Sequence, residues 1–180
     1  MIEAVRKGGV EHTFLADLLL QLQQQQPVDV NAVDASLGDY HYTALHHAIL
    51  LQMPDIVEIL LEKGCNINLA EKKNNATPLH WALCFGNNLM IDKLLKCPNI
   101  DINAQTKNGA TYLYIAASKA NLTVVDKLLQ YPGIDVEKAT YYGETPLACV
   151  LGQCSQSDLS VKEQDNYQKV ISAIKKSLKE

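Results

Sequence analysis

Apolar residues in this chain recur in pairs at a fixed distance. Leu60-Leu61, Leu94-Leu95 and Leu128-Leu129 each lie 34 residues from the next pair. Every pair ends a segment whose apolar positions follow the three-to-four-residue spacing of one helical face. A period of this length is typical of repeat proteins, in which one small supersecondary element is copied many times. The pattern therefore predicts stacked helical units.

A second set of positions keeps the same period. Threonine recurs every 34 residues, at Thr43, Thr77, Thr111 and Thr145. A threonine before an apolar run can cap the first turn of a helix, and a proline at the next position supplies a suitable backbone angle. The two markers together predict a pair of helices in each unit. Such a pair buries its apolar stripe only against neighbouring units.

The repeating unit resembles the ankyrin repeat. Its third copy contains, in order, the sequence T-P-L-H-W-A over residues 77–82, Gly86, Met90-Ile91, Leu94-Leu95 and Asp101-Ile102-Asn103. The resemblance covers about residues 2–178. It implies an all-α ankyrin-repeat solenoid of stacked helix-turn-helix units with β-turn fingers. Three to four well-formed repeats would lie between N- and C-terminal capping units.

The expected boundaries follow from the same alignment of units. We expect a single domain, residues 1–180, made of a capping repeat (1–33), three repeats (34–67, 68–102, 103–136) and a second capping repeat (137–180). Four extra residues lengthen the loop from Ala35 to Tyr42. A polar stretch from Gln153 to Asp165 is expected to delay the last helix. The apolar side of that helix comprises Tyr167, Val170, Ile171, Ile174 and Leu178.

The histidines of the repeating motif have a structural explanation. The resemblance implies that His46 and His80 hydrogen-bond the threonine hydroxyl of their own unit and nearby backbone. Tyr114 and Ala148 occupy the corresponding positions in the later units and cannot make the same bonds.

Composition argues against some classes of function and indicates the cellular compartment. A net charge of −4 gives no positive field to attract nucleic acid, and no apolar run approaches the length needed to cross a bilayer. The five cysteines are odd in number and lack C-x-x-C spacing, which favours reduced thiols. We therefore expect a cytoplasmic protein, monomeric when unbound, without nucleic-acid binding or membrane insertion.

No set of residues predicts catalysis, a metal or a cofactor. His80 and Cys84 lie four apart on one helix, but the repeat already accounts for His80. His41, His46, His47 and Cys65 lack the complete ligand spacing of a structural zinc site. We expect no enzyme activity. The alternatives left open are an enzyme that uses Cys84 or Cys149 and a small-molecule receptor between the fingers.

Tyrosines cluster beside the repeat threonines. Six of the eight lie within four residues of one, namely Tyr40, Tyr42, Tyr112, Tyr114, Tyr141 and Tyr142. Tyr112 and Tyr114 are expected to pack between fingers. The other four are expected to bind a partner, because tyrosine offers a large amphipathic contact area and is enriched at interfaces.

The family resemblance implies that fingers and first helices form a concave binding surface. The expected partner-binding residues are Tyr40, Tyr42, Leu50, Leu51, Lys73, Asn74, Phe85, Lys107, Asn108, Ser118, Lys119, Tyr141 and Tyr142. The leading hypothesis is a non-enzymatic module that binds one or more proteins. The alternative is a bacterial or parasite effector that uses the same surface in the cytosol of a host cell.

Overall fold

A computed structural model describes residues 13–25, 27–34, 36, 40–156 and 159–179. The chain divides into two compact units, residues 1–100 and 101–180. The single domain and the five repeat boundaries expected from the sequence stay predictions. Residues 1–12 and four residues of the long loop, Ala35 and 37–39, lie outside the described residues.

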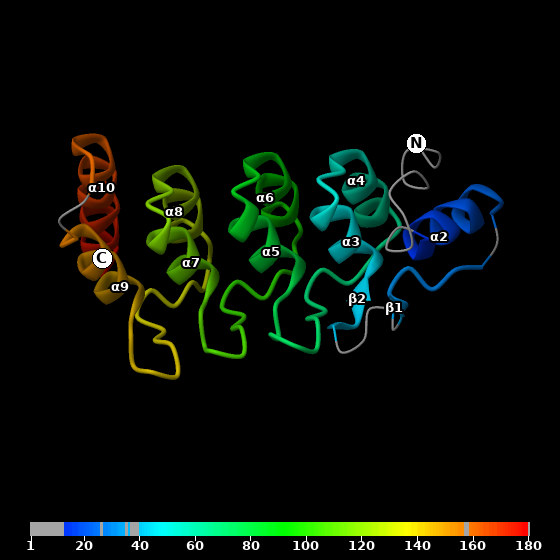
Figure 1. Ribbon diagram of the computed structural model, residues 1–180, viewed down its shortest axis with the longest axis horizontal. Helices are drawn as coiled ribbons and strands as arrows, with labels where there is room; N and C mark the ends of the chain where they lie inside the picture. Colours follow the sequence, from blue (N-terminus) through cyan, green and yellow to red (C-terminus); the bar gives the residue numbers. More distant parts are fainter. Residues whose placement is uncertain (1–12, 26, 35, 37–39, 157–158, 180) are drawn as a thin grey trace. The chain divides into compact units, whose positions relative to one another are not determined.

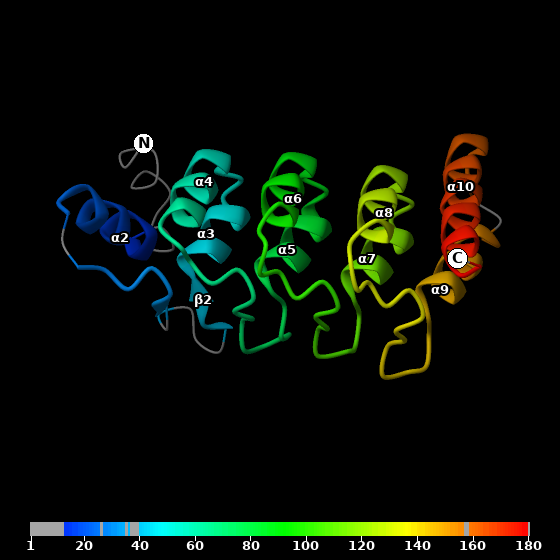
Figure 2. The ribbon, with the colours of Figure 1, turned by 180° about the vertical axis from the view of Figure 1, so that it is seen from behind.

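The first unit contains two helix pairs preceded by one helix and a short hairpin (Figure 1). Its elements are α2 (Thr13–Gln23), β1 (Val33–Asp34), β2 (Tyr42–Thr43), α3 (Ala44–Leu50), α4 (Pro54–Glu62), α5 (Pro78–Phe85) and α6 (Asn88–Leu95). Figure 2 shows the α3/α4 pair beside the α5/α6 pair, with the loops before α3 and α5 extending to the same side. We call the loop before the first helix of each pair a finger.

The second unit contains two further helix pairs. Its elements are α7 (Tyr112–Ser118), α8 (Leu122–Leu129), α9 (Pro146–Cys154) and α10 (Val161–Ser177). The all-α class expected from the sequence is confirmed, since the strands of the described chain are a single antiparallel pair of two residues each.

The apolar pairs define the core as predicted. The first leucine of each pair, Leu60, Leu94 and Leu128, is buried. The second leucine of each pair is half-buried. One helical face therefore packs inward in each of these three repeats, which explains the 34-residue period of the pattern.

Threonine and histidine make the network that the resemblance implied. The N–H of Thr43 donates to Nδ1 of His46 at 3.2 Å, and the Thr43 hydroxyl lies 2.9 Å from the same nitrogen. Because Nδ1 accepts, the proton is on Nε2, which donates to the carbonyl of Ala76 at 3.1 Å. His46 thus joins its own helix to the next finger. Thr77 and His80 repeat the first two contacts.

The first helices of the second unit keep the threonine cap, although no histidine follows the threonine three residues later. The hydroxyl of Thr111 accepts from the N–H of Tyr114, and that of Thr145 accepts from the N–H of Ala148, each at 3.1 Å. The threonine is therefore the constant part of the motif, because it satisfies a helix N–H that has no partner within the helix.

The long loop is closed by the β1–β2 hairpin and by a buried contact between an aspartate and a histidine. Asp34 lies opposite Tyr42 in the hairpin, and its Oδ2 is 3.1 Å from Nε2 of His47 in α3. Burial alone raises the pKa of Asp34, but hydrogen bonds from Ser36 and the charge of His47 outweigh it and leave that pKa lowered. Phe14 of α2 packs on the His47 ring, with 5.6 Å between centroids.

The last helix differs from the prediction in its bounds. α10 begins at Val161, inside the polar stretch that was expected to delay it. The reason is a capping box, in which the side chains of Ser160 and Glu163 each bond the other's backbone N–H. Val170, Ile171 and Ile174 are buried as predicted, whereas Leu178 is 40% exposed.

Candidate protein-binding surface

Neighbouring fingers are joined by backbone hydrogen bonds within each unit. In the first unit the N–H of Lys72 donates to the carbonyl of Tyr40 at 2.9 Å. In the second, the N–H of Tyr141 donates to the carbonyl of Asn108 at 3.1 Å. Gln105 adds a side-chain bond to Ala139 at 3.0 Å. These bonds hold the finger side chains at fixed positions relative to one another.

Four rings of the first unit form a continuous row, which we call the aromatic ladder: Tyr40, Tyr42, Trp81 and Phe85. Their successive centroids are 5.2, 6.1 and 6.0 Å apart. The first and last steps are stacked, and the middle step is edge-to-face. The ladder runs from a finger to the C-terminal end of α5.

Lysine lies at the finger end of the aromatic ladder. Nζ of Lys73 donates to the hydroxyl of Tyr40 at 2.6 Å and lies 4.3 Å from the centroid of that ring. Its backbone is fixed by Glu71, whose buried carboxylate accepts from the N–H groups of Lys73 and Asn74 at 2.7 and 2.8 Å. Lys73 and Asn74 are exposed, as a binding role requires.

Tyr42 does not present the exposed ring that the sequence led us to expect. It is only 7% exposed, because the rings of Tyr40, Trp81 and His47 cover it. Burial, together with the nearby charge of Glu71, raises the pKa of Tyr42 to about 12. We therefore correct its role from partner contact to internal support for the half-buried rings of Tyr40 and Trp81.

Trp81 is the member of the aromatic ladder that sequence reasoning missed. It was attributed to the repeating motif, yet it lies four residues before Phe85 on the same face of α5 and is half-buried. That spacing was the available signal. Phe85 is 48% exposed, which agrees with the expected binding role. Leu50 and Leu51, at the end of α3, are half-buried.

The fingers of the second unit present the most exposed aromatic side chains. Tyr141 is 71% exposed and Tyr142 is 83% exposed. Lys107 and Asn108, on the neighbouring finger, are exposed as well. The backbone bond between Asn108 and Tyr141 brings these two predicted pairs of residues together.

The remaining predicted residues of the second unit divide into two groups. Ser118 is half-buried, and its carbonyl accepts from the hydroxyl of Tyr167 at 3.2 Å, whereas Lys119 is exposed. Tyr112 is fully buried, and the hydroxyl of Tyr114 donates to Glu144 at 2.6 Å. Tyr112 is therefore a core residue and Tyr114 is half-buried, while their packing between fingers stays a prediction.

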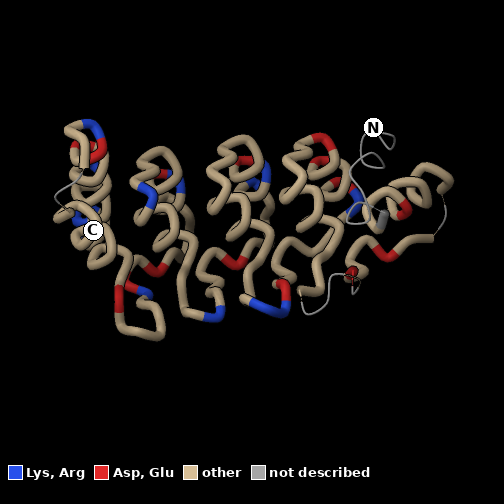
Figure 3. The backbone as a smooth tube through the Cα atoms, in the orientation of Figure 1, with Lys and Arg blue, Asp and Glu red and all other residues tan. Residues whose placement is uncertain are grey.

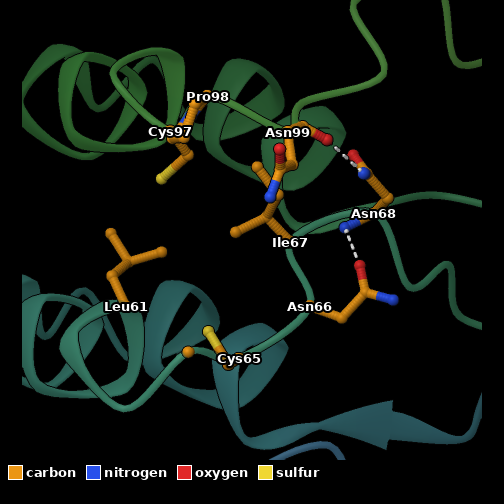
Figure 4. Close-up of a pocket in the computed structure, with 9 residues that line it drawn as sticks. Leu61, Cys65, Asn66, Ile67, Asn68, Cys97, Pro98 and Asn99 are labelled. Carbon is orange, nitrogen blue, oxygen red and sulfur yellow. Dashed lines mark hydrogen bonds between the residues drawn. The ribbon is translucent and has the colours of Figure 1, made fainter.

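The first unit also contains a pocket of about 340 Å³ outside the fingers (Figure 4). It is lined by Leu61, Gly64, Cys65, Asn66, Ile67, Asn68, Cys97, Pro98 and Asn99. Burial raises the pKa of both thiols, that of Cys65 to about 11. Since the thiolate is the nucleophile and the metal ligand, burial makes these cysteines poor candidates for either role.

The other chemical alternatives find little support in the described residues. Burial raises the pKa of Cys149, which opposes its use as a nucleophile. Within these residues no group of three or more metal-ligating side chains comes together. No helix in the same part of the chain combines the length and apolar character needed to cross a bilayer.

Alkylation should distinguish the cysteines. At pH 8 about one Cys65 thiol in a thousand is ionised if its pKa is about 11, so iodoacetamide should modify it at least about 10-fold more slowly than the exposed Cys84. Mass spectrometry of the two peptides over time gives both rates. The rates should converge in urea, and equal rates in the folded protein would contradict the burial of Cys65.

Known proteins share this repeat. A family model described as "Ankyrin repeats (3 copies)" matches residues 1–106 and 79–157. The chain is 31% identical to the nuclear factor NF-kappa-B p105 subunit of Gallus gallus over 47% of this chain and 8% of that protein. It is 32% identical to Rabankyrin-5 of Homo sapiens over 36% of this chain and 6% of that protein. An E3 ubiquitin-protein ligase, KEG of Arabidopsis thaliana, is 32% identical over 58% of this chain and 6% of its own length.

The similarity concerns the repeats alone. The chain covers 6 to 8% of the length of these three relatives, so it corresponds to a small part of each. The family match, by contrast, extends over most of the present chain, from residue 1 to residue 157. Together with the threonine-capped helix pairs and the fingers, this match shows that the chain belongs to the ankyrin-repeat family.

Proposed function

We propose that this chain is a non-enzymatic module that binds a protein partner through its fingers and the exposed ends of its first helices. Ankyrin repeats are generally protein-interaction modules. One observation of this chain carries the proposal: large aromatic side chains are exposed on a finger, at Tyr141 and Tyr142, and at the C-terminal end of a first helix, at Phe85. Rigid aromatic side chains are the usual centres of binding energy at protein interfaces.

The backbone supports a preformed surface. The bonds between fingers fix Tyr40 against Lys72 and Asn108 against Tyr141 before any partner arrives. A surface that is already ordered loses less conformational entropy on binding. This favours recognition of a folded or extended protein partner over chemistry, which would need an activated side chain.

Truncation of single aromatic residues tests the proposal. Phe85→Ala and Tyr141→Ala, made separately, should each weaken binding to a partner captured from the native cell at least about 10-fold. The free energy of unfolding should change by less than about 1 kcal/mol, because both side chains are largely exposed. Titration calorimetry and urea unfolding give the two quantities.

A matched control uses an exposed apolar residue of a second helix, which is neither on a finger nor on a first helix. Leu89 of α6 is 55% exposed, and Leu89→Ala should leave binding unchanged. Full affinity in both aromatic variants would refute the proposed surface. Tyr42 is unsuitable for this test, because removal of a buried ring changes stability as well as binding.

Delivery into a host cell and a cytoplasmic location remain predictions from the sequence. A secretion reporter fused to the whole chain and to a chain without residues 161–180 tests a signal in the tail. Because α10 contains the buried residues Val170, Ile171 and Ile174, the shortened chain must first be shown to stay folded. Equal export of both folded forms would refute a tail signal.

A further inference from the structure

We propose that the aromatic ladder of the first unit binds an extended peptide segment in which an acidic side chain lies near a large apolar one. This inference rests on the proposed function and specifies the chemistry of the partner. The ladder has two chemically different ends, with Lys73 at the finger and Phe85 on α5. Each end selects a different group of the partner.

The α5 end of the aromatic ladder suits a large apolar side chain. Trp81 and Phe85 are stacked with 24° between their ring planes, and Phe85 leaves 48% of its surface exposed. Tyr42 fills the space behind Trp81. An aliphatic or aromatic side chain placed on this flat surface would remove apolar area from water without a rearrangement of the rings.

The finger end of the aromatic ladder suits a carboxylate. Lys72 and Lys73 are both exposed. Figure 3 shows Lys or Arg next to Asp or Glu along the backbone of the finger before α5. The nearby acid, Glu71, is buried and accepts two backbone N–H groups, so it does not present its charge at the surface. Counting only the residues that the structure describes, a partner carboxylate would therefore meet net positive charge at this finger, although the whole chain carries −4.

Lys73 is positioned for this contact. Its bond to the Tyr40 hydroxyl and the two bonds that Glu71 accepts hold both ends of the residue. A held side chain loses less entropy on binding than a freely rotating one.

The dimensions of the aromatic ladder set the spacing of the two partner groups. Its three steps of 5.2, 6.1 and 6.0 Å place Tyr40 at most about 17 Å from Phe85. An extended chain advances about 3.3 Å per residue, so the acid and the apolar side chain should lie within about five residues of each other. A peptide with two neutral apolar side chains at that spacing would make no ion pair with Lys72 or Lys73.

Selection from a random 12-residue peptide display library tests the inference. The wild-type chain should enrich peptides with Asp or Glu within about five residues of Leu, Phe or Trp. The Lys73→Glu variant should enrich Lys or Arg at that position instead, since the charge of the finger is reversed. Lys162→Glu makes the same charge change on α10, outside the fingers and the first helices, and should leave the enriched acid unchanged.

Tryptophan fluorescence then locates the bound peptide. Trp81 is the sole tryptophan, so a synthetic copy of a selected peptide that lacks tryptophan should change the emission of the first unit alone. The Kd should rise at least about 10-fold in Lys73→Glu and in Phe85→Ala. Circular dichroism and urea unfolding must show that both variants remain folded.

The outcomes separate this inference from the proposed function. Selected peptides that need Phe85 but show no acid preference, or that bind Lys73→Glu equally well, would overturn the acidic ligand while a protein-binding surface stands. The inference would also be overturned if the wild-type chain enriched no peptides beyond those that the Phe85→Ala variant enriches in the same selection. The proposed function fails on a different result, namely unchanged capture of the native partner by Phe85→Ala and Tyr141→Ala.

Discussion

Replacement of Gly109 by alanine is expected to destabilise the second unit by about 3 kcal/mol or more. Gly109 has φ of +82°, and a Cβ atom built on it would lie 2.5 Å from the backbone nitrogen of Tyr141 and 2.9 Å from Cα of Thr140. These are backbone atoms of the next finger, which cannot rotate away as a side-chain end can. The methyl group would push the two fingers apart and break the bond between Asn108 and Tyr141.

A second glycine supplies the matched control. Gly143 has φ of +81°, but a Cβ atom there would meet nothing within 4 Å. Gly143→Ala therefore carries the same backbone strain, about 1 kcal/mol, without the steric contact. Urea unfolding of both variants gives the comparison, and hydrogen exchange of the Tyr141 amide reports the bond directly. Equal losses would show that the contact between fingers contributes nothing.

Acid is expected to remove about 3 kcal/mol of stability through His46 between pH 6.5 and pH 4. Burial, only partly offset by the bond to the carbonyl of Ala76, lowers the pKa of His46 from 6.5 to about 4. In this window the unfolded chain binds a proton that the folded chain does not, so the free energy of unfolding falls as the pH falls. Above pH 6.5 neither state is protonated and the effect is absent.

A variant that cannot titrate isolates this contribution. His46→Gln keeps a polar side chain but has no proton to gain, so its free energy of unfolding should fall by about 3 kcal/mol less between pH 7 and pH 4. Urea unfolding at several pH values measures both curves. Asp34, whose pKa is held below its ordinary 3.8, affects stability mainly below this window. Parallel curves for the two proteins would contradict the neutral, buried state of His46.

The repeat explains why so much of the fold could be predicted. A helix cap needs only a threonine and the N–H three residues later, so Thr43, Thr111 and Thr145 specify it locally. The leucine pairs specify which face is buried, because a small helix pair has one place to bury it. Both signals recur along the chain, and recurrence makes them easy to distinguish from chance.

The candidate site was less predictable, because exposure depends on neighbours that are distant in the sequence. Tyr40 and Tyr42 look equivalent in the sequence, yet Tyr42 is buried by Trp81, 39 positions further along. Trp81 looked like part of the scaffold until its contact with Phe85 showed it to be part of the aromatic ladder. The pairing of Asp34 with His47 was also missed, since neither residue follows the repeat.

The sequence by itself determined the ankyrin-repeat fold, the helix caps and the apolar faces. Each of these features is encoded within one repeat, and the repeat is copied at a fixed spacing. The tertiary structure alone decided which aromatic side chains reach the surface and which charges remain there. Tyr42 is covered, Phe85 is not, and Glu71 turns inward while Lys73 faces out. Those differences arise between neighbouring repeats of the first unit, where one finger packs on the next, and no single repeat contains them.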